Sequence, residues 1–461
     1  MTGLNALVDR LARLPAQQRD RALALLRDRG AEFGVLPLSG AQRRLWFLSE
    51  LDEELPIYNV PYAFRLTGPL SVPALREALA DLVRRHELLR ASFFDIDGEP
   101  FQLVRPAIPP PFTIRDWNPA EELRPLLDAE ARRPFDLHGG PLIRATLLTD
   151  GRGEHVLLLT LHHIICDGWS LAILLSELSS CYIARKSGSE PQLPAAGQFR
   201  DARTEPDPEH LRYWLDRLTG APTTLDLPTD HPRPPVQRHR GAELIFTWPA
   251  SLHTVITGFA TQHRSTAFMT VLTGFAALLH RYTGARDLLI GVPVAGRLSL
   301  EAENVAGFFV NTVPLRVRPD PAMSFTALLA QLREATLAAQ THEQTPFDEL
   351  VEALKLPRDL SRHPLVQACF VVLATENELL ELPGLTCELV RGHTGTSKFD
   401  LTMSLIPVPG AGLRGVAEYD TDLFTEPTIR RLADDLRALL SAALADPDRQ
   451  IGALALAGGE R

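Results

Sequence analysis

The segment Leu157–Ser170, with the sequence LLLTLHHIICDGWS, constrains the fold of this chain more than any other stretch. It opens as an apolar run, typical of a buried strand, and stops at two adjacent histidines, His162 and His163. After three intervening residues come Asp167 and Gly168, and a helical pattern follows them. A buried strand that ends in imidazoles, with a carboxylate close behind, predicts a catalytic site at the end of a sheet.

The two histidines are expected to point in opposite directions, because side chains alternate between the two faces of a strand. Only one of them can therefore face a given cleft. A neutral histidine titrates close to pH 7, which suits it to act as a general base there. The alternative is packing, with both rings bound to backbone carbonyls inside the core. The Asp-Gly pair favours catalysis, because a tight turn there would bring the carboxylate of Asp167 back near the histidines or toward another segment.

Composition limits the class of protein. The 461 residues, 45% hydrophobic and 23% charged, suffice for two ordinary domains or one two-lobed unit. The net charge of −10 argues against a general nucleic-acid-binding protein. No apolar run is long enough for a membrane span, the N-terminus does not resemble a signal peptide, and four scattered cysteines match no zinc spacing. These features predict a soluble, cytoplasmic protein with reduced thiols, without a metal site and without membrane or nucleic-acid partners.

The order of expected elements predicts two mixed α/β halves. Helices are expected within residues 1–30, and a proline-rich linker at 222–235 separates two series of strands and helices. We therefore expect one lobe over residues 1–220 and another over 221–461, sharing a pattern of elements and no visible sequence repeat. In the first half, helices are expected at 72–85 and 171–185 and strands at 62–66, 91–94, 101–104 and 142–148. In the second, helices are expected at 267–282, 325–340 and 428–444 and strands near 366–372, 400–405 and 413–418.

The pattern His162-His163-x-x-x-Asp167-Gly168 resembles the HHxxxDG signature of the condensation domains of nonribosomal peptide synthetases. These domains are grouped with the chloramphenicol-acetyltransferase-like acyltransferases. Further motifs in family order extend the resemblance over about residues 36–430: Ser39–Leu48, Arg85–Phe93, Ile290–Arg297, Phe309–Leu315, Gln344–Asp348 and Arg358–Leu365. One motif departs from the family pattern, because the run 198–203 lacks the usual aromatic residues.

The resemblance implies a fold, an activity and partners. The fold would be two chloramphenicol-acetyltransferase-like lobes in a V-shaped pseudo-dimer, with an active-site tunnel between them. The activity would be transfer of an acyl or aminoacyl group from a carrier-protein phosphopantetheine thioester to an amine or hydroxyl acceptor, without a bound cofactor. The acceptor would be free or carrier-bound. Because the sequence begins with Met and shows no carrier or adenylation segment, we expect a free-standing enzyme, with an excised domain as the alternative.

The resemblance also assigns roles to the two histidines. His163 is expected to face the tunnel, where it would take a proton from the nucleophile, or position it and stabilise the tetrahedral intermediate. Which of these roles dominates stays open. His162 is expected to point the other way and to be structural.

The residues around the histidines are expected to support them. Asp167 would form a buried ion pair with Arg90 or Arg297 that holds the loop. A side chain at Gly168 would crowd the tunnel, and the Gly168 N–H could face the oxyanion. Three further residues are expected to line the tunnel wall: Trp169, Asn311 and Thr312.

Two other functions of the same fold stay open. An epimerisation-type domain shares HHxxxDG but would racemise its thioester. A recruitment module would bind a partner without catalysis, although the intact motif argues against it. Heterocyclisation domains and plant-type acyl-CoA transferases carry DxxxxD and DFGWG patterns that this sequence lacks at the corresponding places.

Overall fold

The computed structural model describes residues 34–457 apart from 53, 97, 110, 203–206, 373–379 and 391, together with residues 14 and 22. The helices predicted within residues 1–30 lie, except for those two single residues, outside the described part of the chain. The chain divides into two compact units. Unit 1 comprises Met1–Glu205, Arg297–Val310 and Glu378–Thr394, and unit 2 comprises Pro206–Gly296, Asn311–Asn377 and Gly395–Arg461. A single boundary at residue 220 does not describe this division, because two segments of the second half belong to unit 1.

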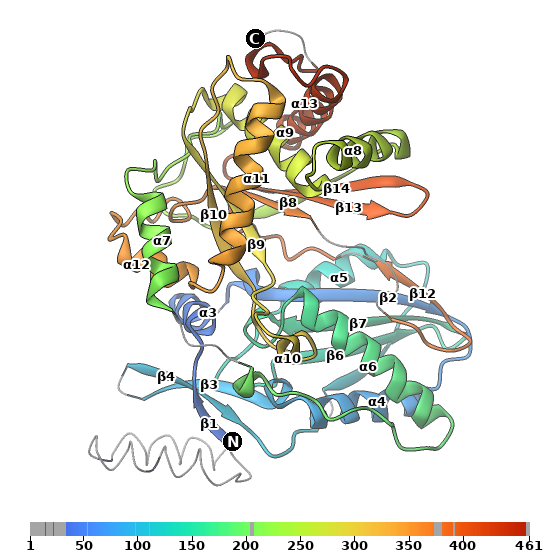
Figure 1. Ribbon diagram of the computed structural model, residues 1–461. Helices are drawn as coiled ribbons and strands as arrows, with labels where there is room; N and C mark the ends of the chain where they lie inside the picture. Colours follow the sequence, from blue (N-terminus) through green and yellow to red (C-terminus); the bar gives the residue numbers. More distant parts are fainter. Residues whose placement is uncertain are drawn as a thin grey trace. The chain divides into compact units, whose positions relative to one another are not determined.

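Unit 1 is built on a five-stranded sheet with the strand order β12-β2-β7-β6-β5 (Figure 1). The pair β5–β6 is parallel, and the other three pairs are antiparallel. The strands are β2 (Asn59–Thr67), β5 (Phe112–Asp116), β6 (Ile143–Thr149), β7 (Glu154–His162) and β12 (Thr386–Val390). The strand that ends at the histidines, β7, lies between β2 and β6, so its position is fixed from both sides.

Helices and a second, smaller sheet make up the rest of unit 1. Helices α4 and α6 run beside each other and bury their apolar faces in the same core as β7. A separate three-stranded sheet has the order β1-β4-β3. The helices are α3 (Gly40–Leu51), α4 (Val72–Arg85), α5 (Leu123–Arg132), α6 (Gly168–Lys186) and α10 (Leu300–Glu303). The short strands are β1 (Gly34–Pro37), β3 (Ala91–Ile96) and β4 (Glu99–Val104), and the 3₁₀ helices are η1 (Pro56–Tyr58), η2 (Glu87–Arg90), η3 (His163–Ile165) and η4 (Phe199–Asp201).

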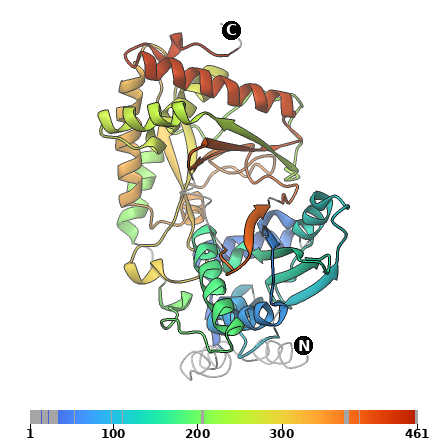
Figure 2. The same ribbon diagram turned by 90° about the vertical axis from the view of Figure 1, so that its right-hand side faces the viewer.

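Unit 2 contains a six-stranded sheet with the order β10-β9-β11-β13-β14-β8. Helices α8, α11 and α13 each contact α9, and Figure 2 shows α13 (red) beside α8. The strands are β8 (Gly241–Trp248), β9 (Leu288–Val294), β10 (Asn311–Val317), β11 (Ala368–Val372), β13 (Leu401–Val408) and β14 (Gly412–Asp420). The helices are α7 (Pro208–Leu218), α8 (Ala250–Gln262), α9 (Ala267–Thr283), α11 (Phe325–Thr341), α12 (Phe347–Ala353) and α13 (Glu426–Ala445), followed by the 3₁₀ helix η5 (Ile451–Ala453).

The two units repeat one sheet topology. In unit 1 the neighbours β2-β7-β6-β5 are antiparallel, antiparallel and parallel, and the neighbours β8-β14-β13-β11 of unit 2 follow the same order and sense. A helix follows the second strand of each set, α6 after β7 and α13 after β14. The shared pattern of elements predicted for the two halves is therefore present in the strand pairing, although the sequences do not repeat.

Local sequence explains the elements that were predicted best. Helix α4 has the bounds predicted for it, because the Ser71 side chain accepts a hydrogen bond from the Ala74 N–H and Leu75, Leu79 and Leu82 form a fully buried stripe. The hairpin β3–β4 turns at Gly98, whose φ of 85° is readily adopted by glycine alone. Among the described residues, no helix is both long and apolar enough to cross a membrane.

Candidate active site

The predicted catalytic segment forms the junction between β7 and α6. The strand ends at His162, whose backbone N–H donates to the Leu142 carbonyl at 2.9 Å. The 3₁₀ turn η3 begins at His163, and Asp167 is the N-cap of α6. A central strand of the sheet therefore delivers the histidines to its end, and a helix begins directly behind them.

His162 is part of the core. Its side chain is buried, with the residue only 5% exposed, and its ring meets the edges of Tyr58 and Phe135 with centroid separations of 6.2 and 6.1 Å. Its Nδ1 accepts a hydrogen bond from the Ile164 N–H at 3.2 Å. This imidazole both fills space and satisfies a buried backbone donor, which is the arrangement expected of a structural histidine.

His163 is half-buried and has a defined tautomer. Its Nδ1 lies 2.8 Å from the carbonyl oxygen of Cys166. Because a carbonyl oxygen can only accept, Nδ1 must carry the proton, and Nε2 of the neutral ring then carries the lone pair. The ring of Phe308 meets the imidazole edge-on, with centroids 5.1 Å apart. The imidazole is thus held by a hydrogen bond and a ring contact with Nε2 as its basic atom.

The carboxylate of Asp167 connects three parts of unit 1. The residue is 3% exposed. Its Oδ1 accepts from the Ser170 N–H at 2.8 Å, from the Ser170 hydroxyl at 2.7 Å and from Arg297 Nη2 at 3.0 Å, and its Oδ2 accepts from the Phe309 N–H at 3.0 Å. Asp167 therefore caps α6, neutralises a buried arginine and fixes the backbone of a segment more than a hundred residues downstream.

Arg297 is the arginine that pairs with Asp167. Its side chain is 2% exposed, and its guanidinium lies over the Phe309 ring at 4.3 Å and over the Trp169 ring at 5.8 Å. Burial lowers the pKa of Arg297, and the neighbouring Asp167 carboxylate opposes that shift. The two aromatic faces and the carboxylate offset part of the cost of removing this charge from water, while the buried Nε and Nη1 have no hydrogen-bond partner among the described residues.

The other predicted partner, Arg90, is not placed against Asp167. Its Nε donates to the Val83 carbonyl at 3.1 Å, and its Nη1 donates to the carbonyls of Arg105 and Pro106. These acceptors come from the end of α4 and from the chain that leaves β4. Arg90 therefore joins two local segments, and the alternative that it pairs with Asp167 is wrong.

The two residues after Asp167 differ in their surroundings. Gly168 begins α6, and a Cβ at this position would meet no described atom within 4 Å. Neither packing within the chain nor a left-handed backbone requires glycine here, so the predicted crowding concerns only a molecule that enters the site. Trp169 is 49% exposed and donates from its indole nitrogen to the Glu303 carbonyl at 2.9 Å.

Asn311 and Thr312 belong to unit 2 and not to the unit that contains His163. Asn311 Nδ2 donates to the carbonyls of Glu343 and Thr345 at 2.9 and 2.7 Å, and its Oδ1 accepts from the Phe347 N–H at 3.0 Å. Its amide therefore holds the turn before α12. Thr312 lies in β10 opposite Pro293. That either residue lines a tunnel stays a prediction.

Sequence reasoning did not place Ser170 or residues 305–308 in the site, and it named Phe309 only as the first residue of a family motif. Ser170 is fully buried and contacts Asp167, Arg297 and Gly307. The spacing Asp-x-x-Ser at the start of a helix is the one local signal for it, because a capping aspartate accepts from the third residue of the helix. Nothing near the histidines in the sequence indicates Phe308 or Phe309.

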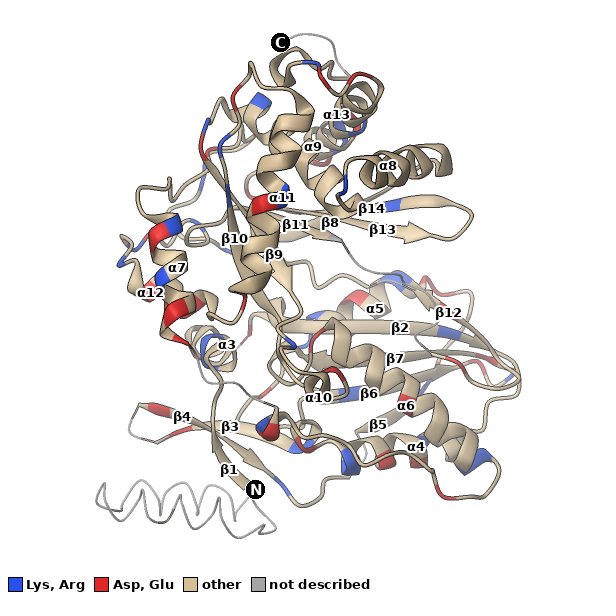
Figure 3. Ribbon diagram, viewed as in Figure 1, with Lys and Arg blue, Asp and Glu red and all other residues tan. Residues whose placement is uncertain are grey.

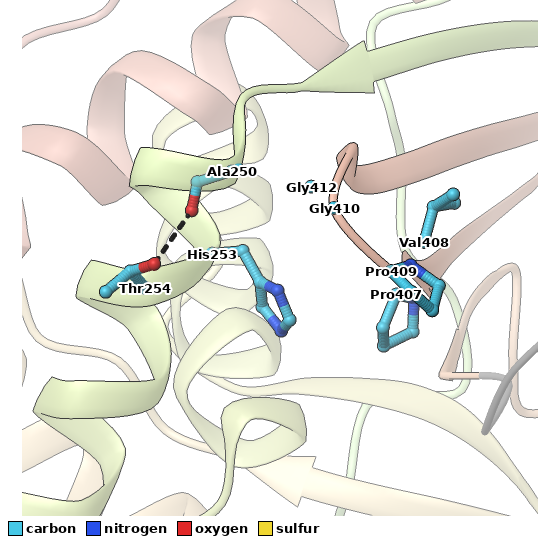
Figure 4. Close-up of a pocket in the computed structure, with 8 residues that line it drawn as sticks. All are labelled: Ala250, His253, Thr254, Pro407, Val408, Pro409, Gly410 and Gly412. Carbon is cyan, nitrogen blue, oxygen red and sulfur yellow. Dashed lines mark hydrogen bonds between the residues drawn. The ribbon is translucent and has the colours of Figure 1, made fainter.

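Two further features of the described residues are the distribution of charged side chains and a hollow, and neither coincides with the predicted site. Figure 3 shows acidic and basic residues interspersed over the elements of each unit. A hollow of about 320 Å³ in unit 2 is bordered by the start of α8, including His253, and by the β13–β14 turn (Figure 4). None of the predicted site residues lines it. Within the described residues, no group of three or more His, Cys, Asp or Glu side chains could hold a metal ion.

Comparison with known proteins now identifies the family. The Condensation domain family matches residues 32–460, nearly the whole chain. The chain belongs to this family. Phosphinothricin tripeptide synthetase PhsC of Streptomyces viridochromogenes is 40% identical over 91% of this chain and 40% of its own length. A linear gramicidin synthase protein of Brevibacillus parabrevis is 40% identical over 92% of this chain and 8% of its own length. The condensation domain described here thus spans less than half of either relative.

Solved structures agree with this assignment. The X-domain from teicoplanin biosynthesis is 28% identical with a TM-score of 0.83, over 91% of this chain and 97% of that domain. The first condensation domain of the CDA synthetase has a TM-score of 0.78 at 23% identity, over 92% of this chain and 99% of its own, which shows the fold alone. The predicted class, mixed α/β with chloramphenicol-acetyltransferase-like lobes, is confirmed.

Proposed function

We propose that this condensation domain transfers an acyl or aminoacyl group from a carrier-protein phosphopantetheine thioester to an amine or hydroxyl acceptor. Members of the family are in general acyltransferases of nonribosomal peptide synthesis, and the relatives named above are peptide synthetases. The observation that carries the proposal for this chain is the hydrogen bond from His163 Nδ1 to the Cys166 carbonyl. It leaves Nε2 as the atom that can take a proton from the acceptor.

The proposed reaction needs one proton acceptor and no cofactor. The acceptor nitrogen or oxygen attacks the thioester carbonyl carbon, and its proton passes to His163 Nε2 while the carbonyl electrons move to oxygen. The C–S bond of the tetrahedral intermediate then breaks, and the proton passes from the imidazolium to the departing sulfur. The histidine returns to its neutral form, so atoms and charges balance.

Two neighbouring groups complete the proposed mechanism. The N–H of Gly168 is in the first turn of α6, where backbone donors and the helix dipole favour negative charge, and we assign it to the oxyanion. Asp167 and Arg297 act on the loop and not on the substrate. The open space at Gly168 supports the assignment of its N–H to the oxyanion, because a substrate could approach the backbone there. A cytoplasmic location and separate carrier proteins as partners belong to the same proposal.

The test compares wild type with His163→Ala. Each protein is given an aminoacyl-carrier thioester and a panel of amine and alcohol acceptors, and mass spectrometry reports the condensed product. We expect product from wild type and a rate lower by about 10²–10⁴ for His163→Ala. His253→Ala, which removes an imidazole beside the hollow in unit 2, is the control and should keep the wild-type rate. The acceptors consumed distinguish amide from ester formation.

Recruitment of another protein without chemistry is a second candidate function. One observation favours it: a chain 29% identical with a TM-score of 0.82 was solved as the complex of the X-domain and OxyB from teicoplanin biosynthesis. Equal product from wild type and His163→Ala would contradict the catalytic proposal. An absence of product from both, even with carrier-bound acceptors, would support recruitment. A racemised thioester would instead indicate an epimerisation-type domain.

A further inference from the structure

We propose that Ser170 is a positioning residue that fixes the segment 305–309 against His163. The inference rests on the proposed function of His163, but the contacts that carry it are independent of that function. Ser170 lies in the first turn of α6 and is fully buried. Its side chain hydrogen-bonds with Asp167, Arg297 and Gly307, so we expect its effect on the reaction to pass through the residues that it holds.

The hydroxyl of Ser170 is at the centre of a saturated network. Its oxygen accepts from the Gly307 N–H at 2.9 Å and from Arg297 Nη2 at 2.7 Å. Its proton has two possible acceptors, Asp167 Oδ1 at 2.7 Å and the Gly307 carbonyl at 2.6 Å. A hydroxyl offers one donor and two lone pairs, so every hydrogen-bonding capacity of this group is in use. Loss of the hydroxyl would leave buried donors of Gly307 and Arg297 without this acceptor.

This network determines the position of Phe308. Gly307 is held by Ser170, and the N–H of Phe309 is held by Asp167 Oδ2 at 3.0 Å. The backbone is therefore fixed on both sides of Phe308, whose ring meets His163 with centroids 5.1 Å apart. A shift of residues 307–309 would move the ring that packs against the imidazole.

Close packing on the other side of the segment limits where it can go. A Cβ placed on Gly307 would collide with the ring of Phe199, and the rings of Phe199 and Phe309 have centroids 4.8 Å apart. The backbone of Gly307 thus lies between an aromatic ring and the Ser170 hydroxyl. The Phe199 ring limits displacement on one side, so the Ser170 hydroxyl is the restraint whose removal should loosen the segment.

Ser179 provides a matched control on the same helix. It is also buried, at 8% exposure, and it also accepts a hydrogen bond from the backbone of a segment that comes from the second half of the sequence. Its hydroxyl accepts from the Glu381 N–H at 3.1 Å and donates to the Leu175 carbonyl at 2.9 Å. The segment that Ser179 holds, 380–390, contributes β12 and not the ring beside His163.

The experiment measures two properties of wild type, Ser170→Ala and Ser179→Ala. Hydrogen exchange with mass spectrometry follows the peptide that contains residues 305–310, and steady-state kinetics give kcat and KM for condensation. For Ser170→Ala we expect the amides of Gly307 and Phe309 to exchange about 10-fold faster or more. We expect kcat to fall about 10- to 100-fold while KM changes by less than about 3-fold, because binding is retained and alignment is lost. Ser179→Ala should leave the exchange rate of this peptide, kcat and KM near the wild-type values.

The outcomes separate this inference from the proposed function. Unchanged exchange in a folded Ser170→Ala protein would overturn the inference, as would equal losses of kcat in Ser170→Ala and Ser179→Ala. If wild type makes no product but the exchange result holds, the proposed function fails and the fixing of the segment stands. Ser170→Cys, which keeps the size and a weak hydrogen-bonding group, should give intermediate values in both measurements. If Ser170→Ala does not fold, a Ser170→Cys protein with wild-type exchange and kcat would contradict the inference.

Discussion

The junction between β7 and α6 in unit 1 and the junction between β14 and α13 in unit 2 occupy the same place in the repeated sheet topology. Both contain a buried aspartate. Asp167 caps its helix and pairs with Arg297. Asp420 is 2% exposed and accepts from the Asp422 N–H at 2.8 Å, and the side chain of Thr425 at the N-cap of α13 makes no capping hydrogen bond.

The difference is in how each carboxylate is compensated. Asp167 lies within hydrogen-bond distance of four donors, the Ser170 N–H and hydroxyl, the Phe309 N–H and the cationic Arg297 at 3.0 Å. Burial raises the pKa of Asp420 to about 6, with the negative charges of Asp422 and Asp400 adding to the shift. Arg233 opposes it, but this arginine makes its ion pair with Asp400. The fold thus supplies a strand end followed by a helix start twice, and the two buried aspartates at these places differ in the neighbours that compensate their charge.

The largest expected effect comes from Asp167→Asn. The amide has one acceptor oxygen where the carboxylate has two, so its NH₂ group must face a donor, and Arg297 loses its counter-charge. Breaking a buried ion pair in this way typically costs about 3–5 kcal/mol. We expect lower free energy of unfolding in urea and lower condensation activity together.

An Asp167→Asn protein with wild-type stability but no activity would contradict this structural role, because Asp167 would then act in the chemistry and not in holding the loop. Arg297→Lys sharpens the test. A lysine keeps the charge but not the planar guanidinium over Phe309, so its loss of stability should be smaller than that of Asp167→Asn.

Asp420→Asn should have the opposite sign at neutral pH. The raised pKa means that the folded protein binds a proton more tightly than the unfolded chain, so this group's stabilisation is present below about pH 4 and is lost as pH rises through about 6. The asparagine cannot ionise, and its side-chain oxygen can still accept from the Asp422 N–H. We expect Asp420→Asn to be more stable than wild type at pH 8, by at most about 2–3 kcal/mol.

The measurement is the difference in Tm between Asp420→Asn and wild type across pH. It should be positive at pH 8 and should decline toward zero below about pH 4, where the carboxyl group is neutral in both states. Taking the difference removes the titration of other groups. A difference that is independent of pH, or negative at pH 8, would show that Asp420 is compensated as well as Asp167 is.

Local patterns in the sequence were sufficient for some of the elements, including the strand that ends at the two histidines. The apolar run before His162 predicts β7, and the capped amphipathic pattern at 72–85 predicts α4, because both depend on neighbours in the sequence. The choice between Arg90 and Arg297 could not be made in this way, since it depends on which distant segment reaches Asp167. The same limit explains why residues 305–308 and Ser170 were not identified. It also explains why the sequence did not indicate that two segments of the second half belong to unit 1.

The smallest expected effect comes from His162→Phe. It tests whether His162 has a structural role, as Asp420 has, or a catalytic one, as proposed for His163. His162 and Asp420 are the last residues of corresponding strands, and both are buried. His162→Phe keeps a ring of suitable size against Tyr58 and Phe135 but removes the Nδ1 that accepts from the Ile164 N–H. Leaving that buried donor without this partner should lower the free energy of unfolding by about 1–2 kcal/mol.

Activity decides what this loss means. Because the His162 ring contacts Tyr58, Phe135 and the Ile164 N–H, whereas the Cys166 carbonyl fixes His163, we expect the folded His162→Phe protein to keep kcat within about 10-fold of wild type. Denaturation curves and condensation rates measured on the same preparation would establish both values. A loss of kcat as large as that of His163→Ala would mean that the two adjacent imidazoles act together. The β7 end would then differ from the β14 end in two catalytic residues and not in one.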